Sequence, residues 1–389
     1  MNRVLIAGVS TRAAAASAVR AGLAVTAIDA FADLDHHKTV RVVPMAHPYS
    51  AHAAARAARD LDCDSVVYLS NFENHPSAIA QLTGRHALWG NPPTTVRRVR
   101  DPMLLAEVLR RRGFATPDVR LTPGTTSVGT IVSKRWLVKP LASGGGLRIR
   151  PWDGFSPLPR ASYLQEFVEG SSGSVVFVAA NGRAVPLGIS RQLVGEPVFG
   201  AGGYQYCGSI FSAVDDPQSP DGTLAKAAGA LAQTVSEEFG LVGVNGIDFV
   251  ARAGIPYAVE VNPRWCASME MVERACGFSV FAAHASACIG GTLPAFGLPH
   301  ERRFDGAVGK AVVYARSPIT VGDTRVWLTE DANIGDIPQP GEDIPAGRPV
   351  CTVFATGSDD TACHHALVER AAGVYAQIKA WNERPSDRA

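Results

Sequence analysis

The chain has 389 residues, of which 46% are hydrophobic and 19% are charged, and this length suits two or three domains. The 37 Lys and Arg residues nearly balance the 36 Asp and Glu residues, so we do not expect a nucleic acid as the main partner. No apolar run approaches the ~20 residues of a membrane helix, and seven cysteines without a C-x-x-C pair fit a reducing compartment. We therefore expect a multidomain enzyme of the cytoplasm with no membrane segment.

The first 95 residues predict a Rossmann-like domain built on a parallel sheet. Apolar runs at 3–8, 23–29 and 65–70 have the length of buried strands, and the helical segments 11–22 and 47–60 separate them. This alternation is typical of parallel strands joined by right-handed crossovers. The Pro-rich segment Asn91–Thr95 is the predicted domain boundary.

The rest of the chain mixes longer strands with a few helices, which indicates an α+β region within a protein that is α/β overall. Asn181-Gly182 is a strong hairpin signal between two apolar runs. The predicted elements are strands 135–140 and 162–170, the hairpin 174–188, helices 103–112 and 223–239, and a second hairpin at 243–264. From about residue 301 we predict strands at 307–315 and 349–355 and a last helix at 361–381.

One reading of the first domain is a dinucleotide site. Asp29 follows Gly8 at about the distance at which an acidic residue binds the NAD ribose. The turn Gly8–Arg12 lacks the second and third glycines of that motif, and G-x-G-x-x-G occurs nowhere in the chain. We favour the interpretation in which Asp29 ends a structural strand, and an NAD-linked oxidoreductase is the less favoured alternative.

Lys139 ends an apolar strand and is followed by Ser143 and three glycines, Gly144 to Gly146. Glycine amides can fold over phosphates while a lysine ammonium reaches the same anion. Only six of the 37 basic residues are lysines, which makes a lysine in this pattern unusual. An exposed lysine before a flexible turn is the competing interpretation.

The segment 163–170 has the character of a strand that leads into a turn. Its backbone could contact an adenine edge beside Phe167 and Val168, and Glu169 could reach ribose hydroxyls. Taken alone, the segment could equally be an edge strand.

The hairpin 245–264 is the most specific stretch of the chain. If its turn centres near Gly254, Asp248 lies opposite Glu260, and Asn262 lies on the same face because strand side chains alternate. Two carboxylates and an amide oxygen suit Mg²⁺, whereas without a cation the two acids would repel each other. A solvated polar face is the alternative. The expected core face carries Ile247, Phe249, Val259 and Val261.

Together, the glycine-covered lysine, the adenine-type segment and the D…E-x-N strand pair resemble the ATP-grasp superfamily of carboxylate–amine and carboxylate–thiol ligases. GVNGIDFV followed by YAVEVNPR is similar to the metal signature of that superfamily, and the resemblance spans roughly residues 1–300. Within it, the chain looks most like carboligases encoded with methanopterin and methanofuran genes, an impression to which the segment 336–357 adds. This implies a role in making a one-carbon coenzyme such as tetrahydromethanopterin.

The resemblance implies an ATP-grasp fold with a pre-ATP-grasp domain at 1–95, an ATP-grasp domain at 96–300 and a β-rich region with a helix at 301–389. The ATP-grasp domain would divide into a lid at about 134–170 and a metal-binding part at about 171–300. It implies ATP and one or two Mg²⁺ ions, with Mn²⁺ as an alternative, and small-molecule carboxylate and amine substrates joined through an acyl phosphate. A homodimer is compatible with this reading.

The resemblance also implies roles for individual residues. Arg264 would stabilise the transferring phosphoryl group, and Arg191 would face the nucleotide or the intermediate. The nucleotide would be bound by Lys139, Ser143, Gly144, Gly145, Gly146, Glu166, Phe167, Val168 and Glu169, and the metal by Asp248, Glu260 and Asn262.

The sequence departs from the family pattern at two places. Pro102 follows Asp101 where many relatives have a first ATP-binding lysine, so either Arg97 or Arg100 compensates or nucleotide binding is weaker. Ser172 stands where many relatives have a glutamate. The absent lysine keeps open a non-catalytic nucleotide-binding or assembly protein, against which the intact metal set argues.

Two loops could complete the site. The loop 194–208 is predicted to be a second flap over the substrate, and the loop 71–75 is either a substrate loop or a polar surface loop. We interpret His36-His37 and His364-His365 as surface residues and Cys266 as a small core residue close to the site.

Overall fold

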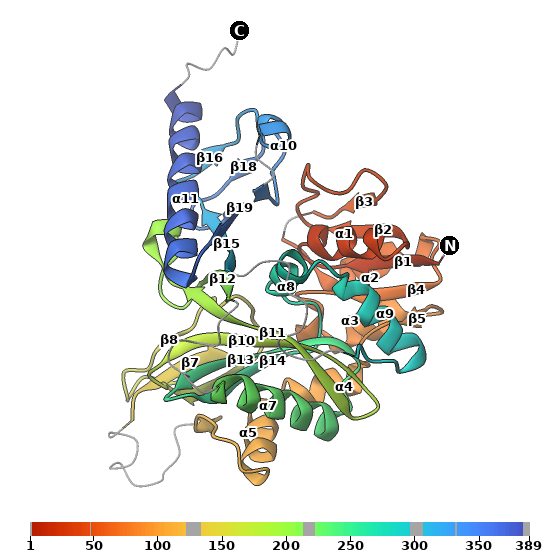
Figure 1. The fold of residues 1–389 in the computed structure, drawn as a ribbon, viewed down its shortest axis with the longest axis vertical. Helices are drawn as coiled ribbons and strands as arrows, with labels where there is room; N and C mark the ends of the chain where they lie inside the picture. The colour runs from red at the N-terminus through yellow and green to blue at the C-terminus, as the bar shows by residue number, and fades with distance from the viewer. Residues whose placement is uncertain are drawn as a thin grey trace.

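The computed structural model describes residues 2–46, 48–121, 134–212, 222–295, 306–330 and 333–383. Figure 1 shows a parallel sheet from the N-terminal part, a large central sheet, and a C-terminal part whose strands continue that central sheet. The helices α8 (Met269–Cys276) and α9 (Val280–Gly290) lie between the central and N-terminal parts.

The N-terminal sheet confirms the predicted parallel architecture. Its five strands pair in parallel in the order β3-β2-β1-β4-β5. The predicted helix 47–60 consists of α2 and the 3-10 helix η1, and His47 lies outside the described residues. The strands are β1 (Arg3–Ala7), β2 (Ala24–Asp29), β3 (Arg41–Pro44), β4 (Ser65–Tyr68) and β5 (Ala87–Leu88). The helices of this part are α1 (Arg12–Arg20), α2 (Ala51–Ala57), η1 (Ala58–Asp60), η2 (Phe72–Asn74) and α3 (Pro76–Thr83), and α4 (Pro93–Val99) and α5 (Pro102–Arg111) follow.

The central sheet has eight antiparallel strands in the order β14-β13-β10-β11-β12-β15-β19-β17. Helix α7 (Thr223–Phe239), whose bounds match the prediction, packs on β10, β11 and β14. The strands are β10 (Ser171–Ala180), β11 (Arg183–Val194), β12 (Tyr206–Ser212), β13 (Gly243–Arg252), β14 (Ile255–Asn262), β15 (Ala307–Tyr314), β17 (Ile334–Gly335) and β19 (Pro349–Gly357).

The C-terminal part contributes β15, β17 and β19 to the same sheet, so the hydrogen-bonded ladder runs on past residue 300. Helix α11 (Asp360–Glu383) packs on β15 and β19. The shorter elements here are η3 (Pro197–Phe199), β16 (Ile319–Thr320), α10 (Val326–Glu330) and β18 (Asp343–Ile344).

A separate four-stranded sheet, in the order β6-β9-β7-β8, contains the segment 134–170 that was predicted as a lid, together with β6, which precedes that segment. Trp136, Val138 and Leu164 make its small core. The strands are β6 (Val119–Arg120), β7 (Trp136–Pro140), β8 (Arg150–Pro151) and β9 (Ser162–Glu166).

The N-terminal part is fixed to the central sheet by buried contacts. One hydrophobic cluster joins Ile6 of β1, Val176 of β10 and Phe281 of α9. The hydroxyl of Tyr68, at the end of β4, donates to the carbonyl of Pro263 (3.0 Å) directly after β14. The carboxyl end of the parallel sheet therefore meets the end of the β13–β14 hairpin.

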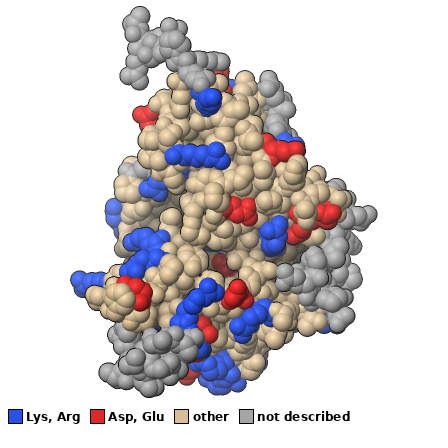
Figure 2. Space-filling view, turned by 90° about the vertical axis from the view of Figure 1, so that its left-hand side faces the viewer, with Lys and Arg blue, Asp and Glu red and all other residues tan. Residues whose placement is uncertain are grey.

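Lys and Arg side chains are interspersed with Asp and Glu on the face shown in Figure 2. Among the described residues, no helix combines the length and apolar character needed to cross a bilayer.

We expect Phe249→Ala to destabilise the central sheet by about 3–5 kcal/mol, because it would leave a cavity against α7. Phe249 is 2% exposed in the core between this sheet and α7. Guanidinium-induced unfolding would measure the loss, with Phe155→Ala as the control, since Phe155 is 84% exposed and its removal should change stability by less than ~0.5 kcal/mol. Equal effects of the two substitutions would contradict this packing.

Candidate active site

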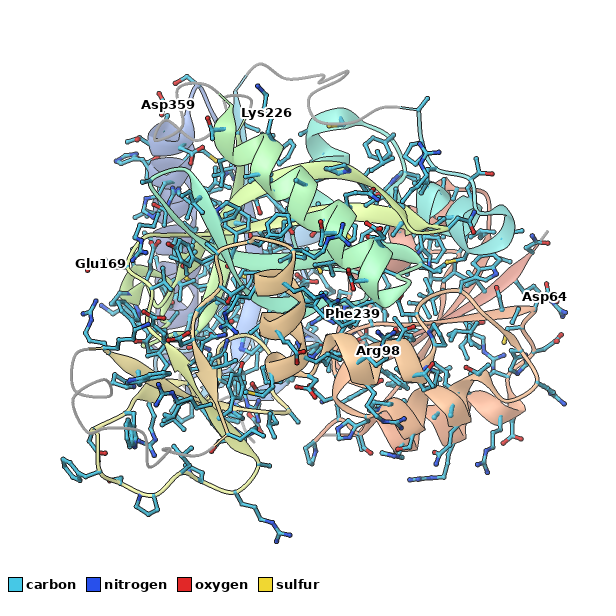
Figure 3. All side chains as sticks on the ribbon, turned by 90° about the horizontal axis from the view of Figure 1, so that it is seen from below. Asp64, Arg98, Glu169, Lys226, Phe239 and Asp359 are labelled. Carbon is cyan, nitrogen blue, oxygen red and sulfur yellow. The ribbon has the colours of Figure 1, made fainter. Side chains whose placement is uncertain are left out.

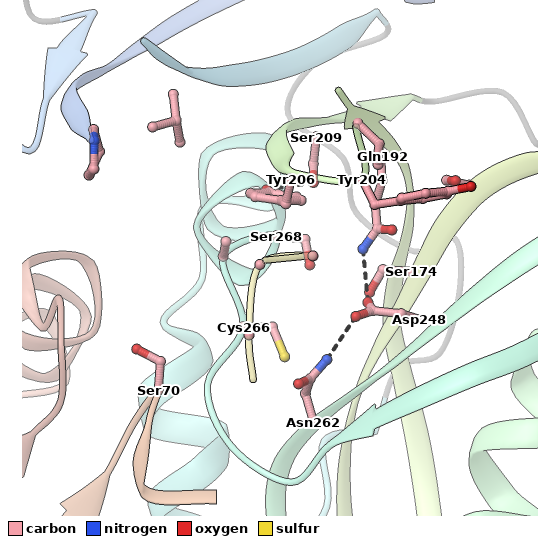
Figure 4. Close-up of a pocket in the computed structure, with 18 of the residues that line it drawn as sticks. Ser70, Ser174, Gln192, Tyr204, Tyr206, Ser209, Asp248, Asn262, Cys266 and Ser268 are labelled. Atoms are coloured by element: carbon pink, nitrogen blue, oxygen red, sulfur yellow. Dashed lines mark hydrogen bonds between the residues drawn. The ribbon is translucent and has the colours of Figure 1, made fainter. Parts of the chain in front are cut away.

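The hairpin β13–β14 places the predicted metal ligands together. Asp248 pairs with Glu260 and Gly246 with Asn262 in the backbone register, as predicted. The Asn262 amide donates to Asp248 Oδ2 (2.9 Å), and the Gln192 amide donates to Asp248 Oδ1 (2.8 Å), as the dashed lines in Figure 4 mark. Three oxygen-bearing side chains thus converge on one side of the hairpin.

A β-bulge changes which side chains of β14 reach the cavity. The register shifts between Asp248 and Phe249, so that Ala258 rather than Val259 pairs with Phe249 and joins its core. Val259, predicted on the core face, lines the cavity instead, and its carbonyl accepts from the Gln165 amide (3.3 Å). The prediction for Val259 was wrong because perfect alternation holds only for an uninterrupted strand.

The two carboxylates of the hairpin differ in their electrostatic surroundings. Burial, together with the nearby Glu260, raises the pKa of Asp248 to about 6. Burial opposes ionisation of Glu260 as well, but Arg100, which is ion-paired with it, and Lys139 bring its pKa below the usual value. Two acids held together with an amide oxygen fit a divalent cation with oxygen ligands, which would relieve their mutual repulsion.

Lys139 lies close to the hairpin carboxylates, although it comes from the segment that was predicted as a lid. Its ammonium group, on β7, donates to Gln165 Oε1 (3.0 Å) and lies 3.5 Å from the carbonyl oxygen of Val259. The side chain is buried and lines the cavity that Glu260 also lines. The interpretation of Lys139 as an exposed residue before a turn is therefore wrong.

The glycine loop contacts the loop predicted to be a second flap. The amide of Tyr206 donates to the carbonyl of Gly145 (3.0 Å). Gly146 has φ +73°, and a Cβ there would lie 1.7 Å from the Tyr204 carbonyl oxygen, so only glycine fits. Ser143 does not line the cavity, and its carbonyl instead accepts from the Asn74 amide (3.4 Å).

The predicted adenosine residues divide into two groups. Glu166, Phe167 and Val168 line the cavity, and Glu166 Oε2 accepts from Lys134 Nζ (3.0 Å). The side chain of Glu169 is 86% exposed beside Arg135, at the edge of the molecule in Figure 3, so it does not reach the cavity.

The two arginines predicted to be catalytic lie in different places. Arg264 lines the cavity, and its guanidinium pairs with the buried Glu73 (2.6 Å), so the loop 71–75 holds this arginine in position. Arg191 points to the other face of β11 and pairs with Asp360 (3.0 Å). Arg191 therefore does not face the cavity as expected, whereas its neighbour Gln192 lines it, because adjacent strand residues face opposite sides.

Of the two arginines that could compensate for the missing lysine, Arg100 is the one at the site. Its guanidinium pairs with Glu260 and lies 3.5 Å from the carbonyl oxygen of Ser143, whereas Arg97 is exposed. Pro102 itself begins helix α5.

Lys139, Glu166, Asp248, Glu260 and Arg264 line one cavity of about 780 Å³, which is within the range of small-molecule sites. It extends from the segment predicted as a lid to the facing surfaces of the N-terminal and C-terminal parts, where its lining includes Arg12, Asp33, Glu270, Lys310 and Asp336. Ser70 and Cys266 stand on its wall in Figure 4.

Asp29 has a structural role. Its carboxylate is fully buried and accepts from the Thr11 amide and hydroxyl (both 2.6 Å) and from the amides of Phe31 (2.7 Å) and Ala32 (2.9 Å). These bonds close the turns after β1 and β2, which is the role we favoured over ribose binding. His36, predicted at the surface, has a side chain only 6% exposed, 3.6 Å from Asp29.

Comparison with known proteins agrees with this geometry. Residues 99–268 match the ATP-grasp domain family model. The biotin carboxylase domain of 2-oxoglutarate carboxylase from Hydrogenobacter thermophilus, solved with MgADP and bicarbonate, superimposes with a TM-score of 0.72 at 15% identity, covering 96% of this chain and 89% of that one. The chain has an ATP-grasp fold.

Other relatives cover nearly the whole chain. The L-amino acid ligase of Bacillus licheniformis gives a TM-score of 0.67 at 16% identity over 96% of this chain and 97% of that one. The N5-carboxyaminoimidazole ribonucleotide synthetase of Thermotoga maritima gives 0.64 at 16% identity over 98% of both chains. An uncharacterized protein of Methanocaldococcus jannaschii is 21% identical over 99% of this chain and 94% of its own length.

Several residues of the ATP-grasp cavity were missed by sequence reasoning. Lys310 carried a usable signal, since it is one of six lysines and sits in the middle of an apolar strand. Gln192 could have been found by assigning strand alternation from Ser174 across the β10–β11 pair. Arg12 and Asp336 had no local signal, because they meet across 324 residues of sequence.

We expect Asp248→Asn to stabilise the metal-free ATP-grasp protein above pH 6. The folded pKa of Asp248, about 6, lies above the ordinary value, so as pH rises the unfolded chain ionises first and folded stability falls between about pH 4 and pH 6. The substitution removes this loss, which is about 3 kcal/mol or less.

The measurement is denaturant unfolding in EDTA at pH 4 and pH 8. The difference between wild type and variant should be near zero at pH 4 and favour the variant at pH 8. A variant that is less stable at pH 8 would show that Asp248 is not electrostatically frustrated in the absence of metal.

Proposed function

We propose that this protein is an ATP- and Mg²⁺-dependent carboxylate–amine ligase that forms an amide-type bond through an acyl phosphate. The observation that carries the proposal is the set Asp248, Glu260 and Asn262 facing Lys139 across one cavity on an ATP-grasp fold. The similar folds of an L-amino acid ligase and of a biotin carboxylase domain in complex with MgADP support it.

In the proposed reaction, a substrate carboxylate oxygen attacks the γ-phosphorus of ATP, ADP leaves, and an acyl phosphate forms. An amine nitrogen, deprotonated to its free base, then attacks the acyl carbon, phosphate leaves with the C–O bond electrons, and the proton that the nitrogen loses passes to the phosphate or to water. Because little covalent work falls to the enzyme, its residues act by positioning groups and by neutralising charge.

Each residue has a defined part in this proposal. Asp248, Glu260 and Asn262 would hold Mg²⁺, which supplies charge neutralisation on the phosphate oxygens when bound. Lys139 would bind phosphate oxygens, and Arg264, oriented by Glu73, would stabilise the transferring phosphoryl group. Because Arg100 pairs with Glu260, it would keep this carboxylate ionised.

The two contacting loops would exclude water from the reactive intermediate. The Gly145–Tyr206 hydrogen bond joins the glycine loop to the second flap over the cavity. An acyl phosphate hydrolyses if water reaches it, so a closed lid serves the proposed chemistry. We propose the division into 1–95, 96–300 and 301–389 on this basis, with the last part completing the cavity wall through Lys310 and Asp336.

A non-catalytic nucleotide-binding protein is the second candidate, and the replacement of the first lysine by Pro102 is the observation that favours it. The cytoplasmic location, the homodimer and the role in tetrahydromethanopterin synthesis stay predictions from the sequence.

We expect Mg·ATP to stabilise the wild-type protein by roughly 2.7 kcal/mol at 100 times its dissociation constant. Differential scanning fluorimetry with ATP plus Mg²⁺, ATP plus EDTA, and NAD(H) would measure the response. Glu260→Gln should lose it, and Glu169→Gln should keep it because that side chain is exposed. A response to NAD(H) but not to Mg·ATP would overturn the proposal.

We expect ADP release that depends on both a carboxylate and an amine, with an acyl hydroxamate formed when hydroxylamine replaces the amine. Lys139→Met should lower the turnover rate by about 10²-fold or more, since it removes a cation from the transferring phosphate. Mg·ATP binding without ADP release, over a panel of carboxylate and amine pairs, would favour the non-catalytic candidate.

A further inference from the structure

The end of the cavity away from the lid carries charged groups that the proposed chemistry does not use. Arg12, at the start of α1, pairs with Asp336 (2.8 Å), Glu270 (2.9 Å) and Asp35 (3.2 Å). Lys310 also pairs with Glu270 (3.0 Å). Both cations on this wall are therefore already neutralised by the protein, which makes them poor receptors for an added anion.

Asp33 differs from its neighbours on the same wall. It lines the cavity and is 6% exposed, and its Oδ2 has no hydrogen-bond partner among the described residues. The carboxylates of Asp336, Asp29 and Asp35 add to burial in raising its pKa well above the ordinary value, and Arg12 opposes them. Asp33 is thus a buried acid among other carboxylates, with one oxygen that has no hydrogen-bond partner among the described residues, which is costly in a folded protein.

The fold holds Asp33 in this position. Asp29, at the end of β2, binds the amides of Phe31 and Ala32, and Ala32 takes φ +51° to turn the chain. On the other side of Asp33, the amide of Leu34 donates to the carbonyl of Ile337 (2.8 Å) in the C-terminal part. Backbone hydrogen bonds on both sides of Asp33 therefore hold it in place.

We propose that this end of the cavity binds the amine substrate as its ammonium ion, that Asp33 is the counter-ion, and that the acceptor belongs to the primary aliphatic amines. The hydroxyl groups of Ser10, Ser70 and Ser268 line the same cavity and could accept the remaining ammonium hydrogens. A bound ammonium would compensate the charge of the buried carboxylate. The carboxylate and hydroxyl oxygens would in turn replace the water that the ammonium loses on entering the cavity. This inference rests on the proposed ligase function and names its amine class.

A divalent metal is the competing occupant. Ligand atoms of Asp29, Asp33 and His36 lie within 4.8 Å of one another. Both oxygens of Asp29 already accept hydrogen bonds from the turn, and Asp29 and His36 do not line the cavity, whereas Asp33 does. The geometry therefore favours a cation that enters through the cavity and contacts Asp33.

The test is calorimetric titration of the full chain with 1,4-diaminobutane, ethanolamine and benzylamine, once in EDTA without nucleotide and once with Mg·ATP in the absence of EDTA. The matched neutral probes are 1,4-butanediol, ethylene glycol and benzyl alcohol. We expect at least one amine to bind wild type, and its matched alcohol not to bind. Asp33→Asn should weaken the binding of that amine by about tenfold or more, because it removes the carboxylate proposed as the counter-ion.

The matched control is Asp62→Asn, whose side chain is 80% exposed and which should leave amine binding unchanged. Asp33→Asn should unfold at a temperature no lower than wild type and should still respond to Mg·ATP, which separates a lost amine site from a misfolded protein. Amine binding can still be measured without nucleotide if Mg·ATP fails to bind, so failure of the proposed function can be distinguished from failure of this inference.

Four results would overturn the inference: no binding by any of the three amines, equal binding by amine and alcohol, equal amine affinity in Asp33→Asn, or a metal site. A metal site would be shown by binding of Zn²⁺ or Mn²⁺ to the wild-type protein in the absence of EDTA, if both Asp33→Asn and His36→Gln abolish that binding.

Discussion

The site depends on two carboxylates that backbone pairing holds side by side. The ladder between β13 and β14 fixes Asp248 opposite Glu260 whether or not a cation is present, so their repulsion is part of the folded protein. The surrounding groups limit this cost without removing it. Arg100 pairs with Glu260, while the amides of Gln192 and Asn262 donate to Asp248. A cation with oxygen ligands would satisfy what remains.

That hairpin also determines how the three parts of the chain meet. Directly after β14, Pro263 and Arg264 turn against the N-terminal sheet, where Tyr68 and Glu73 bind them. Helices α8 and α9 follow at once and pack between the sheets. The strand that carries Glu260 and Asn262 therefore ends in the contact that brings the loops of the parallel sheet to the cavity, which links folding of this interface to assembly of the site.

Local periodicity was enough to predict most elements and the metal hairpin. Alternating apolar runs gave β1, β2 and β4, and the spacing of Asp248 and Glu260 around Gly254 gave their register. The same reasoning failed at Val259, because a bulge breaks the alternation of side chains along β14. It also failed at Arg191, because adjacent residues of a strand face opposite sides, and Arg191 lies on the side where it pairs with Asp360 and not on the side of the cavity. Glu169 was misplaced because nothing in its sequence distinguishes a ribose ligand from an exposed residue after a strand.

Most charged groups at the other end of the cavity could not be predicted from the sequence for a different reason, although Lys310 carried a signal. Arg12, Glu270 and Asp336 come from distant parts of the chain, and only tertiary structure brings them together. Once they meet, their charges neutralise one another in pairs and leave Asp33 as the carboxylate with an unpartnered oxygen on that wall. The same cavity is also lined by the cations Lys139 and Arg264. In the proposed ligase, these cations would attract the phosphates and Asp33 would attract the ammonium group, so the charges of the cavity would direct the two substrates to different places.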